Sequence, residues 1–145
     1  MPDPMALVRQ TFFDRDLVMK KVAAGKRRAI TRQLSFIRIR AKTSIRKRKK
    51  SSPTGQPPSS HSGEMRLIFF GWDQATESGV VGPIPFASQT GGRAQVPSLL
   101  EHGGDVTRTT PKGLSKHLHY GGNPFMGPAE EAERPNFAGQ FKDTV

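Results

Sequence analysis

Two histidines separated by one residue, His117 and His119, have the spacing in this chain that comes closest to a metal-binding pattern. On a β-strand, side chains two residues apart point to the same face, so both imidazoles would be available to one transition metal. The chain has no cysteine, and no third ligand stands at a characteristic distance from this pair. We therefore expect surface histidines rather than a metal centre, and no cofactor.

The other reactive side chains do not form a catalytic set. Glu101 and Asp105 flank a Gly-Gly pair, but one close pair of acids is weak evidence for acid–base catalysis, and a capping or pairing role suits Glu101 better. The serines beside His61 lack an oriented base for nucleophilic attack. The glycines at 91–92 lack the lysine and following helix of a phosphate-binding loop. The sequence therefore predicts no catalytic residues and no enzyme activity.

Basic residues are the second group with functional potential, and they are distributed unevenly. Residues 1–50 hold 16 Lys and Arg and three acids, a net charge of +13, whereas residues 51–145 hold seven and nine, a net charge of −2. Such asymmetry favours contact with nucleic acid or with an acidic protein surface. The best candidates for these contacts are Arg38, Arg40, Arg46, Lys47, Arg48, Lys49 and Lys50.

One long amphipathic helix is expected to carry these cations. Apolar residues recur every three or four positions from Ile30 to Ile45, and only Gly25 interrupts good helix formers. Asp14 or Asp16 can cap the helix N-terminus. We predict an N-terminal arm over 1–13, the basic helix over 14–50, and a linker loop rich in Ser, Pro and Gly over 51–63.

Residues 64–145 are predicted to form a small β-sheet with short helices. Strands at 65–72 and 79–82 make a hairpin, a loop covers 83–95, and a short helix follows at 96–104. The polar residues 105–120 form either a second hairpin or an extended arm, and a last helix occupies 125–133. The expected fold is thus a single α+β domain over 1–145, with the basic N-terminal helix packed on a small antiparallel sheet.

The composition limits the size of the core and bears on the compartment in which the protein is found. Only 34% of the 145 residues are hydrophobic, while the chain holds 15 Gly and 12 Pro, so much of it must be loop or extended arm. The absence of cysteine excludes disulfides and thiol catalysis. No apolar run reaches the roughly 20 residues that cross a bilayer, and no signal-peptide pattern begins the chain. We expect a soluble protein without membrane contact.

Four segments in this order resemble the neck, or head–tail joining, proteins of tailed bacteriophages, a family also described as tail-completion or virion morphogenesis proteins. They are the loop at 51–63, GVVGP at 79–83, VPSLLEHGG at 96–104 and NPFMGPAEEAE at 123–133. The resemblance covers about residues 30–142 and implies structural roles for Leu100, Glu101, Gly103, Pro124, Phe125, Pro128 and Ala129. In this interpretation Phe125 enters the core, and Glu101 bonds backbone N–H groups near Gly103.

The resemblance also implies a function. A neck protein assembles as a homo-oligomeric ring, commonly a hexamer, between the head-side connector or adaptor and the tail terminator or tail tube. The ring surrounds the DNA passage and makes non-specific contacts with packaged DNA possible. The expected location is the virion, after assembly in the host cytoplasm.

Two alternatives remain open at the level of sequence. The chain could form the tail terminator ring rather than the neck layer above it. It could instead be a monomeric basic nucleic-acid-binding protein, whose binding would depend strongly on salt.

Overall fold

A computed structural model describes residues 14–60, 63–87, 93–94, 96–110, 113–142 and 144. The predicted N-terminal arm over 1–13 lies outside these residues. The helices are α2 (Arg15–Ser44), α3 (Val96–His102) and α4 (Met126–Glu133), with the 3-10 turns η1 (Glu64–Arg66), η2 (Arg134–Asn136) and η3 (Ala138–Phe141). The strands are β1 (Arg46–Lys47), β2 (Ser59–Ser60), β3 (Ile68–Asp73), β4 (Ser78–Pro83), β5 (Phe86–Ala87), β6 (Arg93–Ala94), β7 (Gly104–Thr109) and β8 (Ser115–Tyr120).

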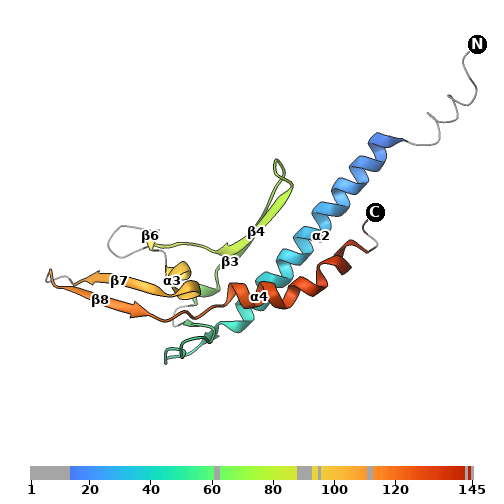
Figure 1. The fold of residues 1–145 in the computed structure, drawn as a ribbon. Coiled ribbons are helices and arrows are strands. Elements are labelled where there is room, and N and C mark those ends of the chain that lie inside the picture. The colour runs from blue at the N-terminus through green and yellow to red at the C-terminus, as the bar shows by residue number, and fades with distance from the viewer. Residues whose placement is uncertain are drawn as a thin grey trace, which may run out of the picture.

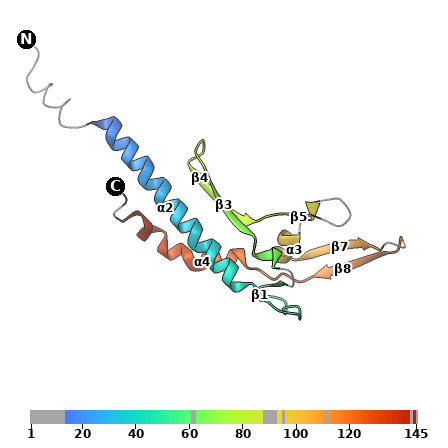
Figure 2. The ribbon, with the colours of Figure 1, turned by 180° about the vertical axis from the view of Figure 1, so that it is seen from behind.

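The long helix α2 organises the molecule (Figure 1). On one side it contacts α4 and η3, and on another it contacts both strands of the β3–β4 hairpin. The β7–β8 hairpin extends away from the C-terminal end of α2, as both views show (Figures 1 and 2). The α+β class is confirmed, with a long N-terminal helix, small antiparallel sheets and short C-terminal helices.

Helix α2 begins where the sequence predicts and ends earlier. Asp14 caps it, because its Oδ1 accepts a hydrogen bond from the Leu17 backbone N–H at 3.0 Å. Over its 30 residues the helix is about 45 Å long. The prediction that it continues to Lys50 is wrong: Ile45 is extended, with φ −78° and ψ 112°, and its side chain is buried. Five consecutive cations would also repel one another in a helix, which favours the extended path.

The segment after the helix is more ordered than a linker loop. The strand β1 pairs in parallel with β2, so Ser59 and Ser60 lie within a small sheet rather than in the predicted loop. The middle of the segment is attached to the chain after β8, where the Gly55 N–H donates to the Gly122 carbonyl at 2.8 Å. The side chain of Asn123 donates to two carbonyls of the same segment, those of Pro53 and Gln56.

The strands form separate two-stranded pairs among the described residues rather than one sheet. β3–β4 is the predicted hairpin, although β3 begins at Ile68 instead of residue 65, because residues 64–66 form the turn η1. The polar segment 105–120 is a second hairpin, β7–β8, which decides between the two predicted alternatives. The predicted loop over 83–95 contains the short antiparallel pair β5–β6.

A small core joins these parts. Its buried residues come from the second half of α2, from η1 and β3, and from the start of α4: Ile37, Ala41, Ile45, Met65, Ile68, Phe125 and Ala129. Gly79 on β4 lets α2 approach the hairpin, since a Cβ there would lie 2.4 Å from Leu34 Cδ1 and 3.1 Å from Ile30 Cγ2. The apolar stripe predicted along α2 therefore does face the core.

Candidate functional site

The basic run from Arg46 to Lys50 forms a surface of its own. All five side chains are exposed, and none forms an ion pair with any residue that the structure describes. The run leaves the end of α2 and enters the loop that β2 closes. Arg46 and Lys47 form the strand β1, where successive side chains point to opposite sides, whereas Lys49 and Lys50 lie in a bend. Arg46 and Arg48 border a shallow cavity of about 350 Å³, together with Ser52 and Gln56.

Arg38 and Arg40, the other two predicted contact residues, are used inside the fold. The Arg38 Nε donates to the Ile68 carbonyl at 2.6 Å, and its guanidinium lies 5.9 Å from the centre of the Phe69 ring. The Arg40 Nε donates to Glu133 Oε1 at 2.5 Å. The structure thus separates the predicted basic set into two arginines that hold elements together and five residues that face outward.

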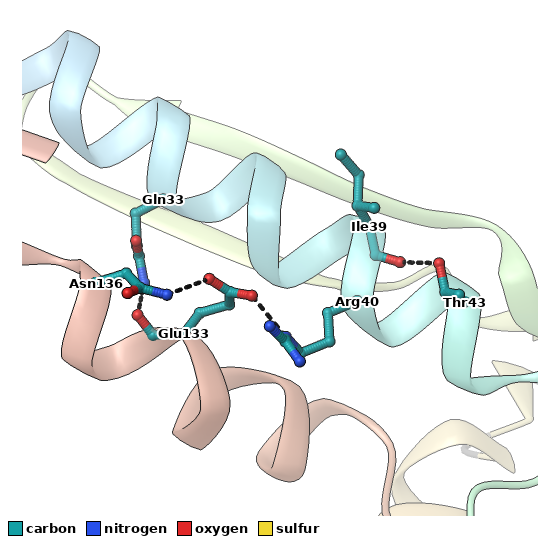
Figure 3. A network of polar contacts seen from close by, with 6 residues as sticks. All are labelled: Gln33, Ile39, Arg40, Thr43, Glu133 and Asn136. Atoms are coloured by element: carbon teal, nitrogen blue, oxygen red, sulfur yellow. Dashed lines mark hydrogen bonds and ion pairs between the residues drawn. The ribbon is translucent and has the colours of Figure 1, made fainter.

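Arg40 belongs to a polar network between α2 and the end of α4 (Figure 3). Glu133 is at its centre: one carboxylate oxygen accepts from Arg40 and the other from Asn136 at 3.1 Å, while its backbone carbonyl accepts from Gln33 at 2.7 Å. The Asn136 amide and the Arg40 guanidinium together hold the pKa of the Glu133 carboxyl below its usual value. Its side chain is only 10% exposed, so the network fixes α4 against α2.

Two of the four segments that carry the family resemblance, the motifs at 96–104 and 123–133, form one structural unit. Glu101, in α3, places its carboxylate at the N-terminus of α4, where it accepts from the backbone N–H groups of Phe125, Met126 and Gly127 at 2.9, 3.0 and 2.7 Å. Phe125 at the N-cap position supplies no side-chain cap, so Glu101 satisfies donors that would otherwise have no partner. The expectation that Glu101 bonds N–H groups near Gly103 is corrected by these contacts.

The remaining motif residues have structural positions. Gly103 ends α3 with φ +74°, and a Cβ there would lie 2.9 Å from the Gly122 N and the Tyr120 O, so only glycine fits. Phe125 and Ala129 are in the core, as predicted for Phe125, and Leu100 packs against it. Pro124 is half-buried, whereas Pro128 is exposed in the first turn of α4.

The histidine pair lies on β8 and contacts β7. His117 Nδ1 is 2.9 Å from the Thr107 hydroxyl, and His119 Nδ1 is 2.8 Å from Asp105 Oδ1, with all four residues exposed. Asp105 and Glu101, considered together in the sequence, therefore have different partners. Within the described residues no three His, Asp or Glu side chains are grouped closely enough to hold a metal ion.

Large apolar side chains remain exposed on the elements that project from the core. Val80 on β4 is 73% exposed, and Leu114 in the β7–β8 turn is 70% exposed. Others are found on α2, on β3 and its flanks, and in the C-terminal turns: Leu17, Met19, Val22, Phe36, Ile39, Leu67, Phe69, Phe137 and Phe141. Exposed apolar side chains of this kind are candidates for contact with other chains.

Comparisons with known proteins find no matching family model, no similar curated protein and no similar solved structure. Among the described residues, none of the helices combines the length and the apolar character needed to cross a membrane.

Proposed function

We propose that this protein is a structural subunit of the neck of a tailed bacteriophage. Copies of the chain form a ring, with six as the expected number, that joins the head-side connector to the tail and surrounds the DNA passage. The protein is not an enzyme in this proposal. Its residues act by assembly.

The observation that carries the proposal is the contrast between a small core and large projecting elements. The core has nine buried apolar residues among those described, whereas Val80 and Leu114 are more than two-thirds exposed on two different hairpins. In a closed ring, each subunit covers such surface on its neighbour. The missing burial is thus supplied between copies rather than within one.

The structural unit formed by the two motifs gives independent support. The segments 96–104 and 123–133 each resemble the phage family on their own, and Glu101 joins them through three hydrogen bonds. Short patterns that match by chance have no reason to meet in the fold. Their contact supports the view that they are one inherited structural element.

The exposed run from Arg46 to Lys50 gives the ring a means of contacting DNA. Its side chains are free to approach phosphates, and contacts of this kind are independent of sequence and weaken with salt.

The test is the mass and shape of the assembled protein. Light scattering of the purified chain should give about six times its mass of 15.9 kDa, and electron microscopy should show a ring with a central channel. If the ring forms only on its neighbours, antibodies against the chain should label the head–tail junction of virions. A protein that is monomeric in solution and absent from virions would refute the proposal.

A monomeric nucleic-acid-binding protein is the second candidate, favoured by the unpaired cations at 46–50. It predicts tight binding of a monomer to duplex DNA or to RNA, with affinity lost when these five residues are replaced by Gln. Binding that survives the replacement would exclude this candidate. A tail terminator ring would differ from the proposed neck ring only in its position along the head–tail axis, and labelling of virions would distinguish the two positions.

A further inference from the structure

A groove between α2 and the β3–β4 hairpin has a composition that neither the core nor the ring proposal explains. Its volume is about 930 Å³. Along α2 it extends from Ala23 to Ser35, about 18 Å at 1.5 Å per residue. The hairpin lies beside the helix along this length in both views (Figures 1 and 2).

The helix α2 contacts both strands of the hairpin, and the groove lies between its basic side chains and the aromatic side chains of β3. Gly79 allows the helix to touch β4, and Val81 packs against the core. Phe70 and Trp72 are the cross-strand partners of Val81 and Gly79, so they are on the same face of the hairpin. They lie to one side of the helix and line the groove, and Phe70 remains 37% exposed.

The helix side of the groove is strongly basic. Arg27, Arg28 and Arg32 line it, and none of them makes an ion pair or hydrogen bond with a described residue. The one carboxylate in the lining, Glu77, is paired with Lys26 at 2.5 Å near the hairpin turn. Three unpaired guanidinium groups therefore face a wall of two aromatic rings.

The two rows also match in spacing and direction. Contacts from Arg38 to Ile68 and from Lys26 to Glu77 show that β3 runs antiparallel to α2. Residues two apart on a strand advance by about 7 Å, and residues four apart on a helix advance by about 6 Å. The spacing between the two aromatic rings is thus similar to the spacing between the arginines on the facing side of the groove.

We propose that this groove binds single-stranded nucleic acid, with the phosphates on Arg27, Arg28 and Arg32 and unpaired bases against Phe70 and Trp72. A basic channel beside exposed aromatic rings is the general chemistry of single-strand binding, because every base has a face that can stack. The bases of a duplex are already stacked on one another and cannot occupy the aromatic wall. This site is separate from the basic run at 46–50, and it does not depend on ring formation.

The chain supplies its own probe, since Trp72 is its one tryptophan. Titration of the full-length protein with a short oligo(dT) should quench its fluorescence in a saturable way. The variant R27Q/R28Q/R32Q should bind at least tenfold more weakly, and the slope of log K against log salt should become less steep by about 2. The matched control R15Q/K20Q/K21Q removes the same charge from exposed positions of α2 outside the groove, and its affinity should stay within threefold.

A second pair of variants tests stacking. F70L should weaken binding by about fivefold or more, while F69L, on the opposite face of β3, should leave it unchanged. Circular dichroism confirms that each variant is folded. Three results would each overturn the proposal: no quenching by oligo(dT), equal losses in the two triple variants, or quenching of Trp72 at lower concentrations of duplex DNA or of polyglutamate than of oligo(dT). A preference for polyglutamate over oligo(dT) would indicate that the groove binds an acidic protein segment instead.

Discussion

Replacement of Glu101 by Ala tests whether the contact between the two motifs stabilises the fold. The carboxylate accepts three backbone hydrogen bonds, of which those from Phe125 and Met126 are partly buried and that from Gly127 is exposed. Water can replace the exposed bond. The two buried donors would lose their partner, at about 1–2 kcal/mol each, and the start of α4 would lose a favourable charge, at about 0.3–1 kcal/mol.

The expected loss in the free energy of unfolding is therefore about 2–5 kcal/mol for E101A. For E101Q we expect about 1–2 kcal/mol, because the amide oxygen can still accept while the charge and the second acceptor are lost. Urea denaturation at a fixed protein concentration measures both values, and the m-value should not change. For a chain of this length the melting temperature of E101A should fall by roughly 5–15 °C.

The matched control is E131Q, an exposed glutamate of α4 whose side chain accepts no hydrogen bond from a described residue. Its unfolding free energy should stay within about 0.5 kcal/mol of the wild type. If E101A is as stable as E131Q, Glu101 does not act as the cap of α4. The contact between the two motifs would then not stabilise the fold.

Three further predictions concern the hairpins and the polar network. G79A should destabilise the fold by about 1–3 kcal/mol in thermal melts, since its Cβ would collide with the buried Leu34, whereas G71A, which has open space, should have little effect. The lowered pKa of Glu133 in the folded state means that its contribution is present above its unfolded pKa and is lost as the pH falls through the folded value. Melts at decreasing pH should therefore show a steeper loss of stability for the wild type than for E133Q, and parallel curves would contradict this reasoning. If the ring buries the β7–β8 turn, L114D should lower the mass measured by light scattering without lowering the melting temperature of the subunit, because Leu114 is 70% exposed in the single chain; an unchanged mass would remove this turn from the interface.

Several features follow from the sequence because they depend on neighbouring residues. The apolar repeat along α2 predicts its core-facing stripe, which Ile37 and Ala41 confirm, and Asp14 begins the helix as a local cap. The turn between β3 and β4 is likewise local, because Asp73 accepts hydrogen bonds from the Thr76 hydroxyl and the Ala75 N–H, and these two contacts lower the pKa of its carboxyl. Apolar repeats, caps and turns of this kind depend on residues that are close in the sequence, so they can be recognised from the sequence alone.

Other features depend on residues that are distant in the sequence. The end of α2 at Ser44 follows from the burial of Ile45 and the pairing of β1 with β2, since helix propensity alone allows the helix to continue. The Phe125 N–H that donates to Glu101 is 24 residues away in the sequence. In the sequence alone, the N–H groups near Gly103 are equally reasonable donors to this carboxylate.

The division of the cations was also decided by the tertiary structure. In the sequence, Arg38 and Arg40 belong with the run at 46–50, and nothing marks Arg27 and Arg28 as different from the other cations of the helix. The sequence by itself determined that the first third of the chain is a basic amphipathic helix. Only the packing of the β3–β4 hairpin and of α4 against α2 decided which guanidinium groups form internal contacts and which face the groove. The physical reason is that the partner of a side chain depends on the elements that the fold brings next to it.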